Sequence, residues 1–138
     1  GQIHRLPGYV RDQLEKSQAA LVKNNGLTLI LALSYGSRAE IVDATRAIAE
    51  KAMTGYMDPQ EIDEDIISNH LNTRLIPDPD ILIRTSGEMR LSNFLLWQIS
   101  YSELIITSTL WPDFRRSQFI AALEEYARRH RRFGALHS

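Results

Sequence analysis

The chain has 138 residues, enough for one domain with a hydrophobic core, and a formal net charge of −1 at pH 7. So small a net charge gives no reason to expect nucleic acid or a membrane surface as a partner. The absence of cysteine excludes a disulfide framework and thiolate metal sites. No apolar run has the length of a membrane-spanning helix and no signal peptide is recognisable, so we expect a cytoplasmic protein.

The first part of the chain predicts a helix followed by a buried strand. Apolar residues recur at helical spacing after Pro7 and predict a helix that runs to about Lys23. The run Leu27–Leu33, LTLILAL, is apolar apart from one threonine. Such a run is typical of a strand that is covered on both faces, as in a parallel sheet.

A strand-to-helix junction is expected after this run. Ser37 and Glu40 have the spacing of a capping box and predict the start of a second helix. Its expected buried stripe comprises Ile41, Ala44, Thr45, Ile48 and Ala52. Arg38 falls in the first turn of that helix, where it is either a solvated charge or a further phosphate contact or structural tie near a site.

The segment from Pro59 to Thr73 predicts a short amphipathic helix, because apolar residues recur among acidic ones. The acidic residues are Glu61, Asp63, Glu64 and Asp65. Such a cluster could suggest metal binding. However, it lies at a predicted helix amino end, where negative charge is favourable in any case, so we assign it no metal.

The stretch from Asp80 to Phe114 carries the candidate site. The short apolar run Ile81–Ile83 follows turn residues and predicts a buried strand that ends at Arg84. A polar loop comes next, and at Ser92 the pattern turns helical, with a side chain suited to an N-cap. Arg84, Arg90 and Ser92 are therefore expected between the carboxyl end of a strand and the amino end of a helix.

A junction of this kind is suited to binding an anion, and ligands of open α/β sheets bind there. The N–H groups and dipole of a helix start favour negative charge, and two guanidiniums add forked donors that match phosphate oxygens. Taken singly, Arg84 and Arg90 could be solvated surface charges and Ser92 a simple cap. Their combination in a glycine-containing loop favours a phosphate or diphosphate site.

The remaining elements complete the pattern. A helix from Asn93, apolar on several sides, is expected to close at Glu103, and Leu104–Thr107 predicts another short strand. Asp113 is placed to cap a last helix, whose far end carries the basic run Arg128–Arg132. These cations complement the helix dipole. Contact with nucleic acid or anionic lipid is the alternative, which the balanced charge and the lack of interleaved aromatic residues disfavour.

Strands that alternate with helices indicate an α/β fold with a central, mostly parallel sheet flanked by helices. The block RTSGEMRLSNFLLWQISYSELIITSTLWPDF, which begins at Arg84, resembles the C-terminal signature of the cis-prenyltransferases, the undecaprenyl diphosphate synthase family. Weaker similarity extends over essentially the whole chain. The resemblance implies one catalytic domain, of which residues 1–138 are the C-terminal portion. We expect the N-terminal portion, with the Asp-Gly-Asn-Gly-Arg-Trp loop that supplies the essential aspartate, to be absent from this sequence.

The resemblance also implies an activity. Members of the family condense isopentenyl diphosphate onto an allylic diphosphate, and each new double bond is cis. The homomeric bacterial type extends farnesyl diphosphate to undecaprenyl diphosphate, the precursor of the lipid carrier for cell-wall synthesis. On this basis we expect Mg²⁺ as the cofactor and a homodimer as the assembly. We also expect no nucleic-acid partner, and peripheral membrane contact for product release.

The implied residue roles follow from position in the matched block. Arg84, Arg90 and Ser92 match the residues that hold the diphosphate of isopentenyl diphosphate. Glu103 matches an acidic residue associated with magnesium, although a lone glutamate at a helix end is a weak ligand. No catalytic residue is assigned within this segment, because the essential aspartate is expected upstream. We therefore expect the parent protein to be active and these residues alone to be inactive.

Residues outside this group carry weaker expectations. Arg132 and Gly134 resemble the Arg-x-Gly tail of the family, which reaches across the dimer towards the active site of the partner. Arg38 is a secondary candidate for the substrate site. Met89 stands where some relatives have histidine, so a proton-transfer or metal role of that histidine cannot apply here.

Two other classes of function stay open at this point. The family includes non-catalytic subunits that scaffold a heteromeric synthase, but such subunits typically lose the diphosphate-binding arginines and serine. A generic nucleotide- or anion-binding module is the other class, and no glycine-rich phosphate motif supports it. Binding of ATP in place of isopentenyl diphosphate would favour that module.

Overall fold

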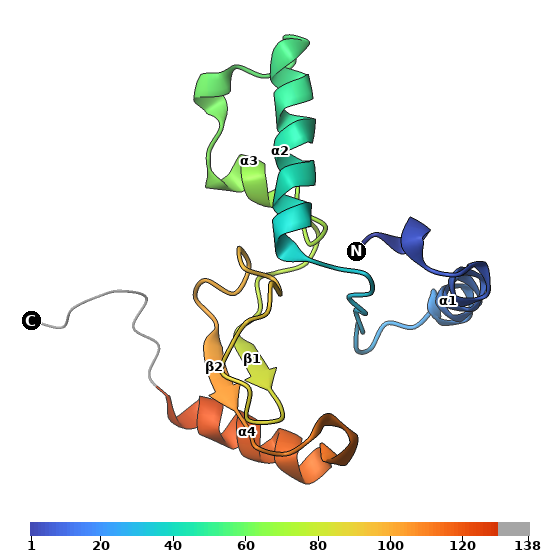
Figure 1. Cartoon of the computed structure of the whole chain (residues 1–138), viewed down its shortest axis with the longest axis vertical. Coiled ribbons are helices and arrows are strands. Elements are labelled where there is room, and N and C mark those ends of the chain that lie inside the picture. Colours follow the sequence, from blue (N-terminus) through green and yellow to red (C-terminus); the bar gives the residue numbers. More distant parts are fainter. Residues whose placement is uncertain (130–138) are drawn as a thin grey trace, which may run out of the picture. The chain divides into compact units, whose positions relative to one another are not determined.

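The computed structural model describes residues 1–129, whose elements fall into two compact units (Figure 1). Unit 1 spans Gly1–Asn72 and is helical, and unit 2 begins at Thr73 and contains the strands. The elements of unit 1 are two short 3-10 turns, Ile3–Arg5 and Pro59–Glu61, and the helices α1 (Gly8–Leu21), α2 (Ser37–Met53) and α3 (Glu64–Ser68). Those of unit 2 are the strands β1 (Ile81–Arg84) and β2 (Glu103–Ile106), a 3-10 turn at Trp111–Asp113, and helix α4 (Arg116–Arg128).

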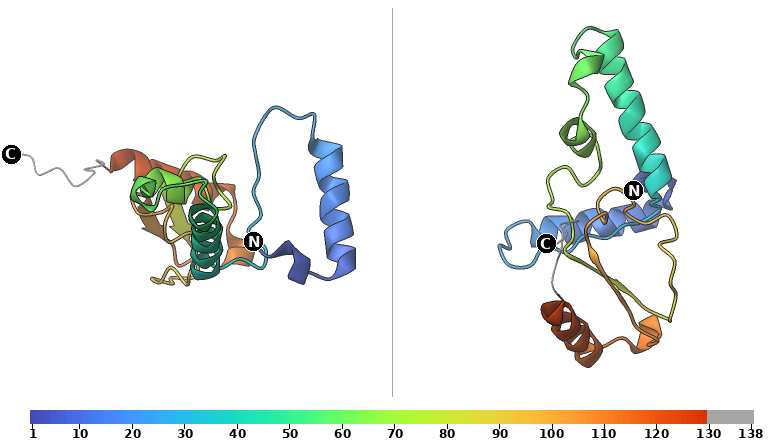
Figure 2. Two further views of the ribbon diagram at one scale, coloured as in Figure 1. Left: turned by 90° about the horizontal axis from the view of Figure 1, so that it is seen from above. Right: turned by 90° about the vertical axis from the view of Figure 1, so that its left-hand side faces the viewer.

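The two strands of unit 2 run parallel. Ile81 lies opposite Glu103 at one end of the pair, and Arg84 lies opposite Ile106 at the other. Helix α4 packs against β2 (Figures 1 and 2). The predicted α/β class, with a parallel sheet flanked by helices, is therefore confirmed.

The core of unit 2 centres on β2. The side chain of Ile105 is 2% exposed, and Ala122 of α4 and Ile99 are also buried. Removing a branched aliphatic side chain of this kind from water stabilises a fold by roughly 1.5–3 kcal/mol. This burial fixes the strand pair, and with it the end of β1 at which Arg84 lies.

Helix α2 forms the centre of unit 1, and α3 packs against it. Its buried residues are Ser37, Glu40, Ala44 and Ile48, which recur at helical spacing. Ala44 and Ile48 of the predicted stripe are thus confirmed, whereas Thr45 is exposed. The buried stripe therefore lies on a slightly different face of the helix from the predicted one, because it includes the carboxylate of Glu40.

That carboxylate, of Glu40, does not form the predicted capping box. The N-cap of α2 is Gly36, and no side chain makes a capping hydrogen bond there. Instead, Glu40 accepts hydrogen bonds from the Tyr35 hydroxyl at 2.6 Å and from the backbone N–H of Asn72 at 2.8 Å. Tertiary partners therefore take the carboxylate that the local spacing assigned to the helix start.

The prediction of a strand at Leu27–Leu33 is wrong. The run has no regular secondary structure, and its side chains are exposed apart from that of the half-buried Leu33, with Leu27 95% exposed and Leu29 76% exposed. A strand requires a neighbouring strand for its N–H and C=O groups, and within residues 1–129 this run is paired with none. An apolar pattern favours extended chain but does not supply the partner.

The predicted helix from Asn93 to Glu103 is also wrong. Ser92, Asn93 and Leu95 have φ angles of 49°, 63° and 45°, which no right-handed helix accommodates. The segment instead forms successive turns, such as the one in which the N–H of Ile99 donates to the carbonyl of Leu95 at 3.0 Å. Glu103 consequently begins β2 and does not close a helix.

Smaller differences concern the helix ends. Asp113 lies in a 3-10 turn and does not cap α4, whose N-cap is Arg115. In the acidic segment, Asp63 accepts a hydrogen bond from the N–H of Ile66 at 2.8 Å, which is the N-terminal role expected for a carboxylate. Within residues 1–129, none of the helices combines the length and the apolar character that crossing a bilayer requires.

Candidate anion site at the end of β1

Strand β1 places Arg84 at its carboxyl end. The three residues before it are half-buried, and the backbone carbonyl of Arg84 accepts a hydrogen bond from the N–H of Thr107 at 2.9 Å. This bond continues the ladder between the strands. The sheet therefore fixes the backbone of Arg84, and its side chain extends from the carboxyl end of β1.

The loop that follows is held against the chain beyond β2. The N–H of Ser86 donates to the carbonyl of Thr109 at 2.8 Å, and that of Gly87 donates to the carbonyl of Thr107 at 2.9 Å. Ser86 and Gly87 both have a φ angle of 66°, which lets the chain reverse here. The reversal returns Glu88, Met89 and Arg90 towards the strand end.

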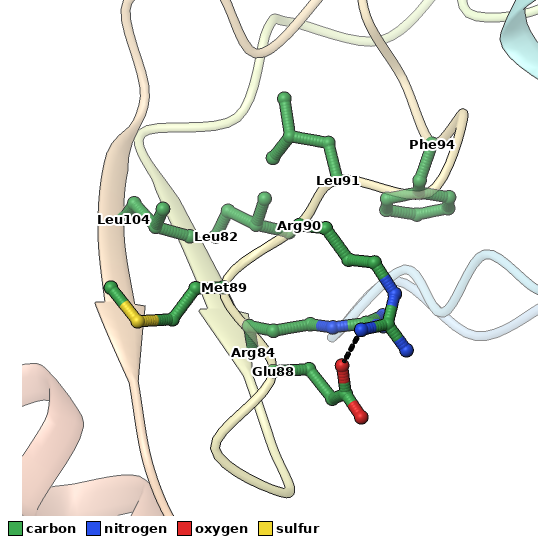
Figure 3. Close-up of a pocket in the computed structure, with 8 residues that line it drawn as sticks. All are labelled: Leu82, Arg84, Glu88, Met89, Arg90, Leu91, Phe94 and Leu104. Carbon is green, nitrogen blue, oxygen red and sulfur yellow. Dashed lines mark ion pairs between the residues drawn. The ribbon is translucent and has the colours of Figure 1, made fainter.

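A small cavity of about 20 Å³ opens at this place (Figure 3). Its lining residues come from both strands and from the loop: Leu82, Arg84, Glu88, Met89, Arg90, Leu91, Phe94 and Leu104. Figure 3 shows the side chains of Arg84 and Arg90 extending to the same side, with the Glu88 carboxylate beside them. A cavity of this volume holds about one water molecule, so a diphosphate would bind at its charged mouth.

Arg84 has an unused donor at this site. Its Nε atom is buried and has no hydrogen-bond partner within the described residues. Leaving a buried polar donor unsatisfied costs about 1–3 kcal/mol, and more for a charged group. An anion that accepts from Arg84 would recover this free energy.

Arg90 differs from Arg84 because it already has an anionic partner. Its guanidinium forms an ion pair with the carboxylate of Glu88, two residues earlier. The side chain of Arg90 is 70% exposed and that of Glu88 is 35% exposed. An ion pair this open to water contributes little stability and can exchange partners. Glu88 was not among the site residues predicted from the sequence, although its place between Gly87 and Arg90 is a signal.

The structure gives Ser92 a different setting from the one predicted. Ser92 is exposed, is not among the residues that line the cavity, and does not begin a helix. The expected attraction of a helix dipole is therefore absent from this loop. The N–H groups of Ser86 and Gly87 are also committed to carbonyl groups. Attraction for an anion here rests on the two guanidiniums.

Glu103 lies at the other end of the strand pair from Arg84. Its Oε2 atom accepts a hydrogen bond from Nη1 of Arg129 at 3.0 Å, and the same nitrogen donates to the carbonyl of Leu104 at 2.9 Å. Arg129 also forms an ion pair with Glu125. The hydrogen bond with Glu103, followed by the one with Glu125, raises the pKa of Arg129.

These contacts bear on the expected magnesium. Among residues 1–129 no group of three or more potential ligand side chains is placed to hold a metal ion. Glu103 offers one carboxylate, of which Arg129 engages one oxygen. Mg²⁺ demands octahedral coordination by oxygen. The described residues therefore do not form a magnesium site by themselves.

The other expected residues are distributed as follows. Arg38 is exposed in the first turn of α2, within unit 1. Met89 lines the cavity and presents a neutral thioether there. Arg132 and Gly134 lie outside the described residues.

Unit 2 is an α/β unit with Arg84 at the carboxyl end of a parallel strand and Arg90 in the loop that follows, which is where ligands of open α/β folds bind. Comparison with known families then identifies the lineage. Residues 1–134 match the family described as "Putative undecaprenyl diphosphate synthase". The chain belongs to the undecaprenyl diphosphate synthase family, and the resemblance noted in the sequence is confirmed.

Relatives of known sequence are similarly close. The chain is 53% identical to an isoprenyl transferase of Porphyromonas gingivalis over 134 residues, which are 97% of this chain and 53% of that protein. It is 47% identical to an isoprenyl transferase of Bacillus subtilis over 136 residues, which are 99% of this chain and 52% of that protein. The chain thus spans about half the length of the curated relatives it matches.

Solved structures give the same result. A lavandulyl diphosphate synthase from Lavandula x intermedia, in complex with dimethylallyl diphosphate, matches with a TM-score of 0.94 and 42% identity. That match covers 98% of this chain and 58% of the other. A probable undecaprenyl diphosphate synthase from Campylobacter jejuni matches with a TM-score of 0.80 and 32% identity, over 98% of this chain and 61% of the other.

Proposed function

We propose that the protein containing this chain is a prenyltransferase. It condenses isopentenyl diphosphate onto an allylic diphosphate, farnesyl diphosphate, with cis double bonds, and its product is undecaprenyl diphosphate. The observation that carries the proposal is the pair of guanidiniums, from Arg84 and Arg90, at one cavity at the end of β1. Family membership and the isoprenyl transferase relatives support it. The structural relative that holds dimethylallyl diphosphate supports an allylic diphosphate as one substrate.

In this proposal Arg84 and Arg90 bind the diphosphate of isopentenyl diphosphate. Each guanidinium can donate two parallel hydrogen bonds to phosphate oxygens. Ser92 adds a hydroxyl donor from the same loop. Condensation forms a carbon–carbon bond while the allylic partner releases its diphosphate and isopentenyl diphosphate loses a proton. The diphosphate of isopentenyl diphosphate takes no part in bond breaking, so the two arginines stabilise ground state and transition state alike.

The remaining parts of the proposal rest on the family alone. Mg²⁺ is the proposed cofactor, and Glu103 would contribute one carboxylate to it together with groups from outside this chain. A homodimer is proposed, in which Arg132 and Gly134 approach the active site of the partner. Release of the polyprenyl product involves contact with a membrane surface.

The test is a turnover assay with labelled isopentenyl diphosphate, farnesyl diphosphate and Mg²⁺. The whole protein should form labelled polymer, and chromatography of the extracted lipid gives its chain length. Failure of the whole protein to form polymer would refute the activity, and if it nevertheless stimulated a partner synthase, a scaffolding role would replace it. The 138-residue chain assayed alone should form none, and polymer from it would contradict the assignment of essential groups to the rest of the protein.

A further inference from the structure

Glu88 stands out within the anion site because its charge opposes the function proposed for that site. It lines the same cavity as Arg84 and Arg90, and its carboxylate pairs with the guanidinium of Arg90 (Figure 3). A carboxylate and a phosphate oxygen accept hydrogen bonds from the same guanidinium edge. Glu88 therefore holds one of the positions that a bound diphosphate would need.

The side chain of Glu88 is held at its tip by the ion pair with Arg90. The backbone N–H of Glu88 donates a long hydrogen bond, 3.5 Å, to the carbonyl of Thr85. The carboxylate is 35% exposed, and its partner Arg90 is 70% exposed. Both side chains can therefore turn into water without disturbing the strand pair.

Arg84 offers the complementary observation. Its Nε atom is buried and has no hydrogen-bond partner among residues 1–129, so the Glu88 carboxylate satisfies Arg90 but leaves this donor unused. A diphosphate carries more negative charge and more acceptor oxygens than a carboxylate and can engage both guanidiniums. The exchange of Glu88 for a diphosphate is therefore favourable, whereas exchange for a small monoanion gains little.

We propose that Glu88 is a tethered counter-anion of this site. It occupies Arg90 when no diphosphate is bound, and an incoming diphosphate displaces it. This inference rests on the diphosphate site of the proposed function. It assigns to Glu88 the role of lowering the affinity for anions, so that only a ligand able to bind Arg84 and Arg90 together competes well. A tethered competitor also returns to Arg90 as a diphosphate leaves, which speeds release.

The experiment measures the dissociation constant of inorganic pyrophosphate by calorimetry, in the whole protein at low ionic strength. Glu88→Gln keeps the shape of the side chain and removes its charge. We expect it to tighten pyrophosphate binding by about three- to tenfold, the range set by a partly exposed charge pair. Glu124→Gln is the matched control, because it removes the same charge from an exposed position on α4, away from the cavity. It should change the affinity by less than about twofold.

A double-mutant cycle identifies the cause. If Glu88 competes for Arg90, the gain from Glu88→Gln should disappear in an Arg90→Gln background. Unchanged or weaker pyrophosphate binding by Glu88→Gln would overturn the inference and would make Glu88 a residue that positions Arg90. A gain that persists without Arg90, or that Glu124→Gln reproduces, would also overturn it. Absence of pyrophosphate binding in every variant would overturn the anion site itself, whereas failure to form polymer despite tight binding would refute only the proposed activity.

Discussion

Arg129, just beyond the end of α4, donates to the carboxylate of Glu103, the first residue of β2, over 3.0 Å. The same guanidinium donates to the carbonyl of Leu104. One side chain just beyond α4 thus joins this helix to the amino end of β2. Because the two side chains are 35% and 26% exposed, the link is only partly screened by water.

Arg129→Gln should therefore destabilise unit 2. We expect a loss of about 1 kcal/mol, which for a chain of this size lowers Tm by roughly 3–6 °C. Differential scanning calorimetry measures it, and Arg116→Gln, at an exposed position on the same helix, is the control. Equal stability of the two variants would contradict a role for the link.

The pKa of Arg129 sets the pH dependence of that difference. Its pKa is raised in the folded chain, so its contribution is fully present below the ordinary pKa of an arginine and is lost as the pH rises through the folded pKa. The effect of Arg129→Gln should therefore stay constant between about pH 6 and 9 as far as this group is concerned. Chemical denaturation at several pH values tests this, and a difference that vanished near neutrality would be inconsistent with it.

Arg84→Gln should weaken substrate binding. Loss of charge-assisted hydrogen bonds worth about 1.5–3 kcal/mol corresponds to a rise in Kd for pyrophosphate of roughly 10- to 150-fold. Arg84→Lys should recover only part of the affinity, because an ammonium cannot donate in a fork. In turnover, KM for isopentenyl diphosphate should rise far more than kcat falls, since this diphosphate stays intact. A fall in kcat with unchanged KM would remove Arg84 from diphosphate binding.

Arg90→Gln should have a smaller effect than Arg84→Gln. Arg90 is 70% exposed and must give up Glu88, whereas Arg84 has a buried donor that no group in the described part of the chain engages. We expect a loss of about threefold to tenfold in pyrophosphate affinity, with a shallower salt dependence than in the unchanged protein. Titrations at increasing ionic strength measure both quantities. The reverse order of the two arginines would show that burial does not decide their importance.

Ile105→Ala should strongly destabilise the chain, because the side chain is 2% exposed at the centre of β2. Large-to-small substitutions at such sites cost about 2–5 kcal/mol. Ile120→Ala, at a residue of α4 that is 42% exposed, should cost much less. Urea denaturation followed by circular dichroism compares the two. Ile105→Val, with an expected cost of about 0.5–1.5 kcal/mol, provides a folded variant for the comparison if Ile105→Ala does not fold.

The sequence predicted those elements whose signals are local. Helices α1, α2 and α4 and the strands β1 and β2 lie close to where periodicity and short apolar runs placed them. The prediction failed where the outcome depends on distant partners. The run Leu27–Leu33 has the pattern of a strand but no strand beside it, and the buried carboxylate of Glu40 is taken by Tyr35 and Asn72.

The candidate site was predictable in its composition but not in its geometry. Position in the matched block indicated Arg84 and Arg90, and the structure places both at one cavity. The helix expected at Ser92 failed because backbone angles within the next few residues are left-handed, which side-chain patterns do not report. The ion pair of Glu88 with Arg90 was missed, because either charge alone reads as a solvated loop residue.

The apolar run Leu27–Leu33 should make this chain prone to aggregation when it is studied in isolation. Exposed leucine and isoleucine side chains on an unpaired extended segment allow the same segment of other molecules to pair with it and form intermolecular β-sheets. In concentrated solutions aggregation should begin through this segment and appear as turbidity. Leu29→Lys, which adds one charge to the run, should delay the turbidity.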